Sequence, residues 1–213
     1  MVSEYLILWK IIAPLQMPLT TANPQDLHGF WDQDVKTLGS IVRGQADIRD
    51  IANNTVPLWF AELNPAKINF GVALYGRGYT VTDKTCNGLG CSFKGPSKPA
   101  VCTNSDGVMS LVEIQQVIVD KKLTPKLLPE AMMKQITWDD QWIGYDDADT
   151  IKLKKAWADN QCFGGTMAWS IDFNSGAGSG LTPVNTTDGT CGRGKGQTVC
   201  GNWPDGDCCS RQV

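Results

Sequence analysis

The chain lacks the residues from which histidine or zinc chemistry is built. It has a single histidine, His28, and none of its 8 cysteines are spaced as a C-x-x-C pair. One histidine cannot form a multi-histidine metal site or a histidine-assisted nucleophile, and the cysteine spacing does not fit zinc. We therefore expect no metal, and we interpret the cysteines as a disulfide set formed in an oxidising, secretory setting. Two N-x-S/T glycosylation acceptors, Asn53 and Asn185, agree with that setting.

The chain also lacks a basic excess and a long apolar run. Its 19 Lys and Arg residues are outnumbered by 22 Asp and Glu residues, so nucleic acid is not an expected partner. The apolar stretch at residues 5–15 is interrupted by Lys10 and Pro14 and is too short to cross a bilayer, so we expect no membrane partner. Because Glu4 and no Lys or Arg precede this stretch, it also lacks the positive start of a signal peptide.

Residues 163–174, FGGTMAWSIDFN, form a short apolar run followed by turn residues. This pattern predicts a strand that is buried on both faces. In such a strand Met167, Trp169 and Ile171 share one face. A tryptophan at the end of a strand can form the floor of a sugar site, where its ring stacks on a pyranose; the alternative is a tryptophan that only packs in the core.

Residues 67–80, KINFGVALYGRGYT, have the same character. We expect one strand with bulky residues on one face and small residues on the other, ending in Tyr75 and Arg77. This pattern is typical of a barrel strand whose polar tip enters a site at the C-terminal rim.

Three helices are expected, one before the strand at 67–80 and two between it and the strand at 163–174. The first covers residues 47–63 and is kinked or divided by Pro57, and the second begins at the capping box of Ser110 and Glu113. The third begins at Asp146 or Asp147 and runs to about residue 160. A helix between two parallel strands is the repeating unit of an α/β barrel. For the third helix the expected packing residues are Ile151, Leu153, Ala156 and Trp157.

Four motifs in a fixed order connect the chain with a known family. They are DLHGFWD (26–32), YGRGYT (75–80), WDDQWIGYDD (138–147) and GGTMAWSIDFN (164–174). Together they resemble the family 18 glycoside hydrolases, specifically the fungal multidomain chitinases, over about residues 25–174. The resemblance implies an α/β fold, a partial TIM (β/α)8 barrel of about strands six to eight, with an α+β insertion at about 78–135 and a return to the barrel at 138–147.

The resemblance also divides the rest of the chain. Residues 1–21 are expected to be an atypical N-terminal segment upstream of a truncated barrel domain (22–174), and 175–189 a linker rich in Gly, Ser and Thr. Residues 190–213 resemble a truncated hevein-like chitin-binding module, a small disulfide-rich tail that includes Ser210. We expect Cys162 to pair with one of the cysteines of the insertion.

The resemblance implies a set of sugar-contacting residues. Tyr75 and Arg77 would line the groove, and Trp31 would stack on a leaving-group sugar. Asp26 would orient an acetamido group, although Gln25 stands where the family has a tyrosine and Pro24 falls within the expected strand. Trp169 would form the floor, with Met167 beside it as packing. The alternative is that all six are structural remnants of a barrel. The implied partner is chitin or a chitooligosaccharide.

The family hydrolyses β-1,4-linked N-acetylglucosamine polymers without a metal or organic cofactor. A glutamate that ends a D-x-x-D-x-D-x-E run protonates the leaving oxygen, and the substrate's acetamido oxygen attacks the anomeric carbon. The chain contains no such run. We therefore predict no catalytic residue and no activity for this chain alone, and we keep a non-catalytic, lectin-like chitin-binding protein as the alternative.

Overall fold

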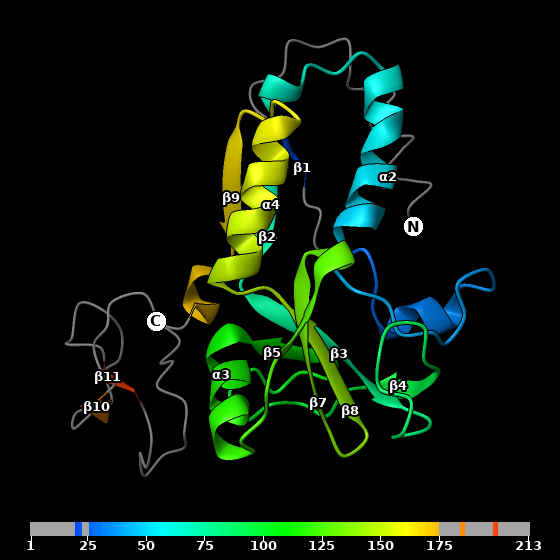
Figure 1. Ribbon diagram of the computed structural model, residues 1–213, viewed down its shortest axis with the longest axis vertical. Coiled ribbons are helices and arrows are strands. Elements are labelled where there is room, and N and C mark those ends of the chain that lie inside the picture. Colours follow the sequence, from blue (N-terminus) through cyan, green and yellow to red (C-terminus); the bar gives the residue numbers. More distant parts are fainter. Residues whose placement is uncertain (1–19, 23–25, 175–183, 186–197, 200–213) are drawn as a thin grey trace.

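A three-stranded parallel sheet forms one half of the molecule (Figure 1). The computed structural model describes residues 20–22, 26–174, 184–185 and 198–199. Within them, the strands of this sheet lie in the order β1 (Thr20–Ala22), β2 (Ile68–Ala73) and β9 (Gly165–Trp169). The first strand ends before Pro24, so this proline does not interrupt the ladder as the sequence had led us to expect. The α/β class is confirmed, and the described strands form no closed barrel.

Two helices, α2 (Ile48–Phe60) and α4 (Ala148–Asn160), cover the parallel sheet. Their buried side chains pack with Phe70 and Val72 of β2 in one apolar cluster. Asp47 caps α2, which continues past Pro57 to Phe60 and is not divided. Asp147, with Thr150, caps α4. Two of the four packing residues expected on α4 are wrong: Leu153 and Ala156 are exposed, because the buried stripe of the helix runs through Thr150, Lys154 and Ala158.

An antiparallel sheet forms the other half of the molecule. Its strands lie in the order β4-β3-β8-β7-β6, with β5 paired to β3, and helix α3 (Leu111–Asp120) packs on one face. The strands are β3 (Tyr75–Val81), β4 (Phe93–Pro96), β5 (Val108–Ser110), β6 (Lys126–Leu128), β7 (Met133–Trp138) and β8 (Gln141–Tyr145). Residues 138–147 do not return the chain to the parallel sheet, because β8 pairs with β3 and β7.

Residues 67–80 form two strands and not one. The break is at Leu74, whose N–H donates to the carbonyl of Trp169 in the parallel sheet, 2.7 Å away, and whose carbonyl accepts from Leu111 N. From Tyr75 onward the chain pairs with β5 and β8 in the antiparallel sheet. Tyr75 and Arg77 therefore lie at the start of β3 in the antiparallel sheet, shortly after the C-terminal end of β2.

The prediction that 163–174 is one strand buried on both faces is also wrong. β9 ends at Trp169, and Ile171 belongs to a short 3-10 helix, η4 (Ile171–Phe173). Among the described strands β9 pairs only with β2, so its other edge has no partner there. Trp169 is 58% exposed in this structure.

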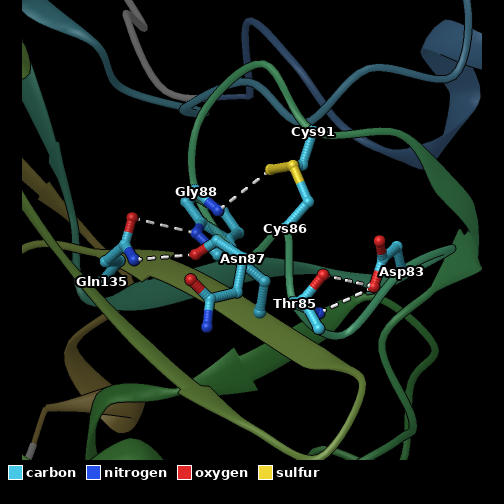
Figure 2. Close-up of a disulfide and its surroundings, with 8 residues drawn as sticks. Asp83, Thr85, Cys86, Asn87, Gly88, Cys91 and Gln135 are labelled. Atoms are coloured by element: carbon cyan, nitrogen blue, oxygen red, sulfur yellow. Dashed lines mark hydrogen bonds between the residues drawn. A yellow bond between two sulfur atoms is a disulfide. The ribbon is translucent and has the colours of Figure 1, made fainter.

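A disulfide closes a small loop at the edge of the antiparallel sheet (Figure 2). Cys86 pairs with Cys91, and buried Gln135 of β7 donates its side-chain amide to the carbonyl of Asn87 inside the loop. Cys162 is free and exposed, so its predicted pairing with an insertion cysteine is wrong. It follows α4 and precedes β9, whereas Cys86 already has Cys91 five positions away.

Three further short helices complete the described structure. They are the 3-10 helices η1 (Phe30–Asp34), η2 (Pro65–Lys67) and η3 (Pro129–Ala131). A separate pair of short parallel strands joins β10 (Val184–Asn185) to β11 (Thr198–Val199). Ser210 and the expected hevein-like cysteines lie outside the described residues. Within the described ranges no helix is long and apolar enough to cross a membrane.

The capping box of α3 makes stability depend on pH. Burial tends to raise the pKa of Glu113, but hydrogen bonds from Ser110, Thr103 and the Cys102 N–H outweigh it and lower the pKa below 4.5. A lowered pKa stabilises the fold above pH 4.5, and that stability is lost as the pH falls through the folded-state pKa. We expect Glu113→Gln to flatten the dependence of the unfolding midpoint on pH below 4.5, as measured by urea unfolding at several pH values. An unchanged slope in the variant would contradict this.

Candidate carbohydrate-binding site

An ion pair at the end of the parallel sheet joins two of the predicted site residues. Arg77 Nε donates to Asp26 Oδ1 over 2.7 Å, although 51 positions separate the two residues in the chain. Asp26 has a φ of 64°, a left-handed conformation that Asp adopts more readily than most residues. Burial, the largest single influence, lowers the pKa of the Arg77 guanidinium, but the hydrogen bond and charge of Asp26 together with the contribution of Tyr75 outweigh it and raise the pKa. The Asp26 side chain stays 38% exposed.

Two aromatic rings flank this ion pair. The guanidinium carbon of Arg77 lies 4.8 Å from the centroid of the Trp31 ring and 5.6 Å from that of Tyr75. These distances fit cation–π contacts, which hold the Arg77 side chain flat between the rings. Trp31 lies on η1, and a side chain on Gly29 would collide with its ring, because an added Cβ would be 2.3 Å away. The glycine of the HGFW sequence thus makes room for the tryptophan.

The antiparallel sheet explains the spacing of the YGRGYT motif. Gly76 and Gly78 face Ile143, and an added Cβ at Gly76 would also lie 2.8 Å from Ile114 of α3. Alternate residues of a strand point to opposite faces, so Tyr75 and Arg77 point away from α3 and toward Asp26. The two glycines allow close packing on one face while the other face carries the polar and aromatic groups.

Tyr75 is buried beneath the site and does not line its surface, whereas the sequence had predicted that it would. Only 4% of it is exposed, and its ring contacts that of Phe173 at 6.1 Å. Burial, and then the Asp26 carboxylate, raise the pKa of its hydroxyl, so the phenol is a neutral hydrogen-bond donor at any physiological pH. The surface of the site is therefore formed by Trp31, Asp26 and part of Arg77, with Tyr75 beneath them.

A buried carboxylate that the sequence did not single out supports the segment of Trp31. Asp32 is 1% exposed; its Oδ2 lies 2.8 Å from Nδ1 of His28 and 3.7 Å from an Arg43 nitrogen. His28 Nε2 also lies 3.4 Å from Asp50 on α2. The His28–Asp32 spacing of four residues was visible in DLHGFWD, but the contacts with Arg43 and Asp50 come from distant parts of the chain. His28 is thus part of the support of the site.

Trp169 and Met167 lie on the neighbouring strand β9. Trp169 pairs with Ala73 and Met167 with Gly71, so both are beside the end of β2, from which Tyr75 continues. Within the described residues, no hydrogen bond or ring contact joins either side chain to the four residues Asp26, Trp31, Tyr75 and Arg77. We call these four the Asp26 cluster. The structure therefore brings four of the six predicted residues into direct contact and places the other two at the same end of the sheet.

Groups for general acid or metal chemistry do not meet at this site in the described part of the chain. Glu113 is occupied by the cap of α3, and Glu62 and Glu130 are exposed elsewhere. The described residues contain no group of three potential metal ligands. What the Asp26 cluster offers is a carboxylate acceptor, a guanidinium donor and an aromatic face, a combination that binds a polar ring with one apolar face.

Known proteins share this fold and sequence. The chain is 30% identical to mouse chitotriosidase-1 over 125 residues, which covers 58% of this chain and 26% of the relative. It is 26% identical to an endochitinase of Brugia malayi, covering 79% of this chain and 32% of the relative. The chain thus spans about a third or less of the length of these relatives.

Solved structures show the same partial coverage. The family 18 chitinase of Cycas revoluta, solved with (GlcNAc)3, matches with a TM-score of 0.65 at 22% identity, covering 77% of this chain and 45% of that one. Human YKL-39, described as a pseudo-chitinase with retained chitooligosaccharide binding, matches with a TM-score of 0.64 at 24% identity, covering 74% and 44%. The model of the glycosyl hydrolases family 18 matches residues 25–174. The chain therefore belongs to glycosyl hydrolase family 18.

Proposed function

We propose that this chain binds chitooligosaccharides at the Asp26 cluster and does not hydrolyse them by itself. The observation that carries the proposal is the meeting of Asp26, Trp31, Tyr75 and Arg77, which come from two distant stretches of the sequence. One related structure was solved with (GlcNAc)3, and another is described as a pseudo-chitinase with retained chitooligosaccharide binding.

The chemistry of the cluster fits an N-acetylated sugar. The half-buried ring of Trp31 would stack on the apolar face of a pyranose ring. The Asp26 carboxylate accepts hydrogen bonds only, and it would orient the acetamido N–H of the sugar. Trp169, exposed at the end of β9, would extend the surface to a second sugar with Met167 beside it.

The parallel strands β1, β2 and β9 correspond in this proposal to strands six to eight of a family barrel. The family's acid is a glutamate in a D-x-x-D-x-D-x-E run, and the 213 residues contain no such run. Hydrolysis of chitin therefore needs a group that this chain does not supply. The Cys86–Cys91 disulfide supports a secretory setting.

Binding and turnover are tested together on the purified chain. We expect chitotetraose to quench or shift the tryptophan fluorescence saturably, while a chromogenic chitooligosaccharide releases no product in the same tube. Cellotetraose, which has the same β-1,4 backbone without acetamido groups, serves as the matched ligand and should bind more weakly. Turnover that a substitution within this chain abolishes would contradict the absence of catalysis. Equal binding of the two ligands would contradict the role given to Asp26.

A further inference from the structure

A buried glutamine outside the predicted site connects the two segments that form the Asp26 cluster. Gln45 lies just before Asp47, the cap of α2, and is 1% exposed. Its side-chain amide Nε2 donates to the main-chain carbonyl of Tyr75 over 2.8 Å. Its own main-chain carbonyl accepts from the N–H of Leu27, over 3.0 Å. One residue thus holds Tyr75 through its side chain and the neighbour of Asp26 through its backbone.

The backbone of Gln45 is itself fixed. The adjacent Gly44 has no room for a side chain, because an added Cβ would lie 2.4 Å from Sδ of Met133. Arg43 accepts a hydrogen bond from the Tyr79 hydroxyl at its carbonyl, over 3.0 Å. Val42 donates to the carbonyl of Cys91 in the disulfide loop and accepts from Gly90 N. The segment before Gln45 is therefore anchored to the antiparallel sheet. Gln45 is thus held in one place, and it fixes the positions of its two partners, Tyr75 and Leu27.

Only the Nε2 group of the Gln45 side-chain amide forms a hydrogen bond among the described residues. Its Oε1 is buried and has no hydrogen-bond partner among the described residues. An unpaired buried acceptor reduces stability and offsets much of what the Nε2 bond contributes. The net contribution of this side chain to stability is therefore small, whereas its contribution to the position of Tyr75 is direct.

We propose that Gln45 is a positioning residue for carbohydrate binding, which sets the register between Asp26 and the Tyr75–Arg77 strand. This inference rests on the function proposed above. The ion pair of Arg77 with Asp26 and its stacking between Trp31 and Tyr75 all depend on that register, because they cross from one segment to the other.

The first variant is Gln45→Met, which keeps the volume and removes the donor. We expect it to lower the affinity for chitotetraose about three- to tenfold, the loss that one neutral hydrogen bond corresponds to. We expect little change in the urea midpoint, because the unpaired Oε1 is removed together with the donor. Gln45→Glu should lose affinity at neutral pH and regain it on acidification, since a protonated carboxyl again donates to the Tyr75 carbonyl.

The matched control is Gln135, another buried glutamine whose amide donates to a main-chain carbonyl (Figure 2). Both ends of its amide are paired: Nε2 donates to Asn87 O and Oε1 accepts from Trp142 Nε1, each over 3.0 Å. Gln135→Met should therefore cost more stability than Gln45→Met and leave the affinity unchanged. If Gln45 had a purely structural role, the two variants would change affinity to the same extent, and any loss of affinity would follow the loss of stability.

Hydrogen exchange separates this inference from the proposed function. In Gln45→Met we expect faster exchange at residues 26–34 and at β3, and no change there in Gln135→Met. If the unsubstituted chain does not bind chitotetraose, the proposed function fails, and the exchange pattern still tests whether Gln45 positions the cluster. Unchanged exchange at residues 26–34 and β3 in Gln45→Met would overturn the inference, as would an unchanged affinity in a chain that binds.

Discussion

Replacing Asp146 with Asn is expected to lower the free energy of unfolding by about 3–5 kcal/mol, the usual cost of removing one partner of a buried ion pair. Asp146 Oδ2 lies 2.5 Å from Nζ of Lys154, and the two side chains are 2% and 1% exposed. In the variant Nζ of Lys154 loses the carboxylate that it faces in the core. Urea unfolding followed by far-ultraviolet circular dichroism at pH 7 measures the change.

The opposite replacement, Lys154→Met, should cost less. Burial raises the pKa of Asp146 despite the neighbouring ammonium, so this carboxyl can take up a proton when its partner is lost. A raised pKa means that the stability of the variant is greatest at low pH and is lost as the pH rises through that pKa. Asp146→Leu combined with Lys154→Met should recover most of the loss, since an apolar pair replaces the ions. Equal costs for the two single variants would contradict the asymmetry.

Arg77→Ala is expected to lower the affinity for chitotetraose about tenfold or more. The guanidinium makes the charged hydrogen bond to Asp26 and both ring contacts of the cluster, and a bond to a charged group is worth about 1.5–3 kcal/mol. Without Arg77 the Asp26 carboxylate loses its partner and the Trp31 ring loses its support. Arg77→Lys keeps the charge but not the planar group, so it should recover only part of the affinity. Isothermal titration of each variant measures the effect.

Arg49 provides the control for this experiment. It also forms an ion pair with an aspartate, Asp47, at 2.5 Å, but it lies on α2 and its side chain is 52% exposed. Arg49→Ala should therefore leave the affinity within about twofold of the unsubstituted chain, because its partner Asp47 is not part of the Asp26 cluster and the Arg49 side chain is largely exposed. A comparable loss in both variants would indicate a general effect of net charge and not a site at Arg77.

Local chemistry could be predicted from the sequence, and long-range pairing could not. The capping box of Ser110 and Glu113 was confirmed. The start of α4 at Asp147, one of the two residues expected, was also confirmed. Both could be predicted because a cap depends only on residues a few positions apart. Four of the six predicted site residues meet. The sequence did not predict the change of sheet at Leu74, because the strand pattern is continuous on both sides of it. Whether a strand pairs in parallel or antiparallel is decided by partners such as Trp169 and Leu111, which lie far along the chain.

The supporting residues of the site were missed for the same reason. Gln45 is polar and lies before a helix, so its sequence context is typical of an exposed loop. Nothing near it in the chain shows that Tyr75 will be its partner. The exposure of Trp169 could not be predicted either. An apolar run occurs both in strands covered on both sides and in strands such as β9, which pairs on one side only among the described strands.

The position of Leu74 between the two sheets means that each half of the molecule can change in evolution without the other. It is the junction between the parallel sheet and the antiparallel unit of residues 75–145, to which Tyr75 and Arg77 belong. Two residues of the proposed site, Tyr75 and Arg77, thus lie in the antiparallel unit, whereas Trp169 belongs to the parallel sheet. A change in the packing of the antiparallel unit would therefore move Arg77 relative to Asp26 while the parallel strands stay unchanged. A relative that lost this unit would keep the helices on its parallel strands and would lose Arg77, the partner of Asp26.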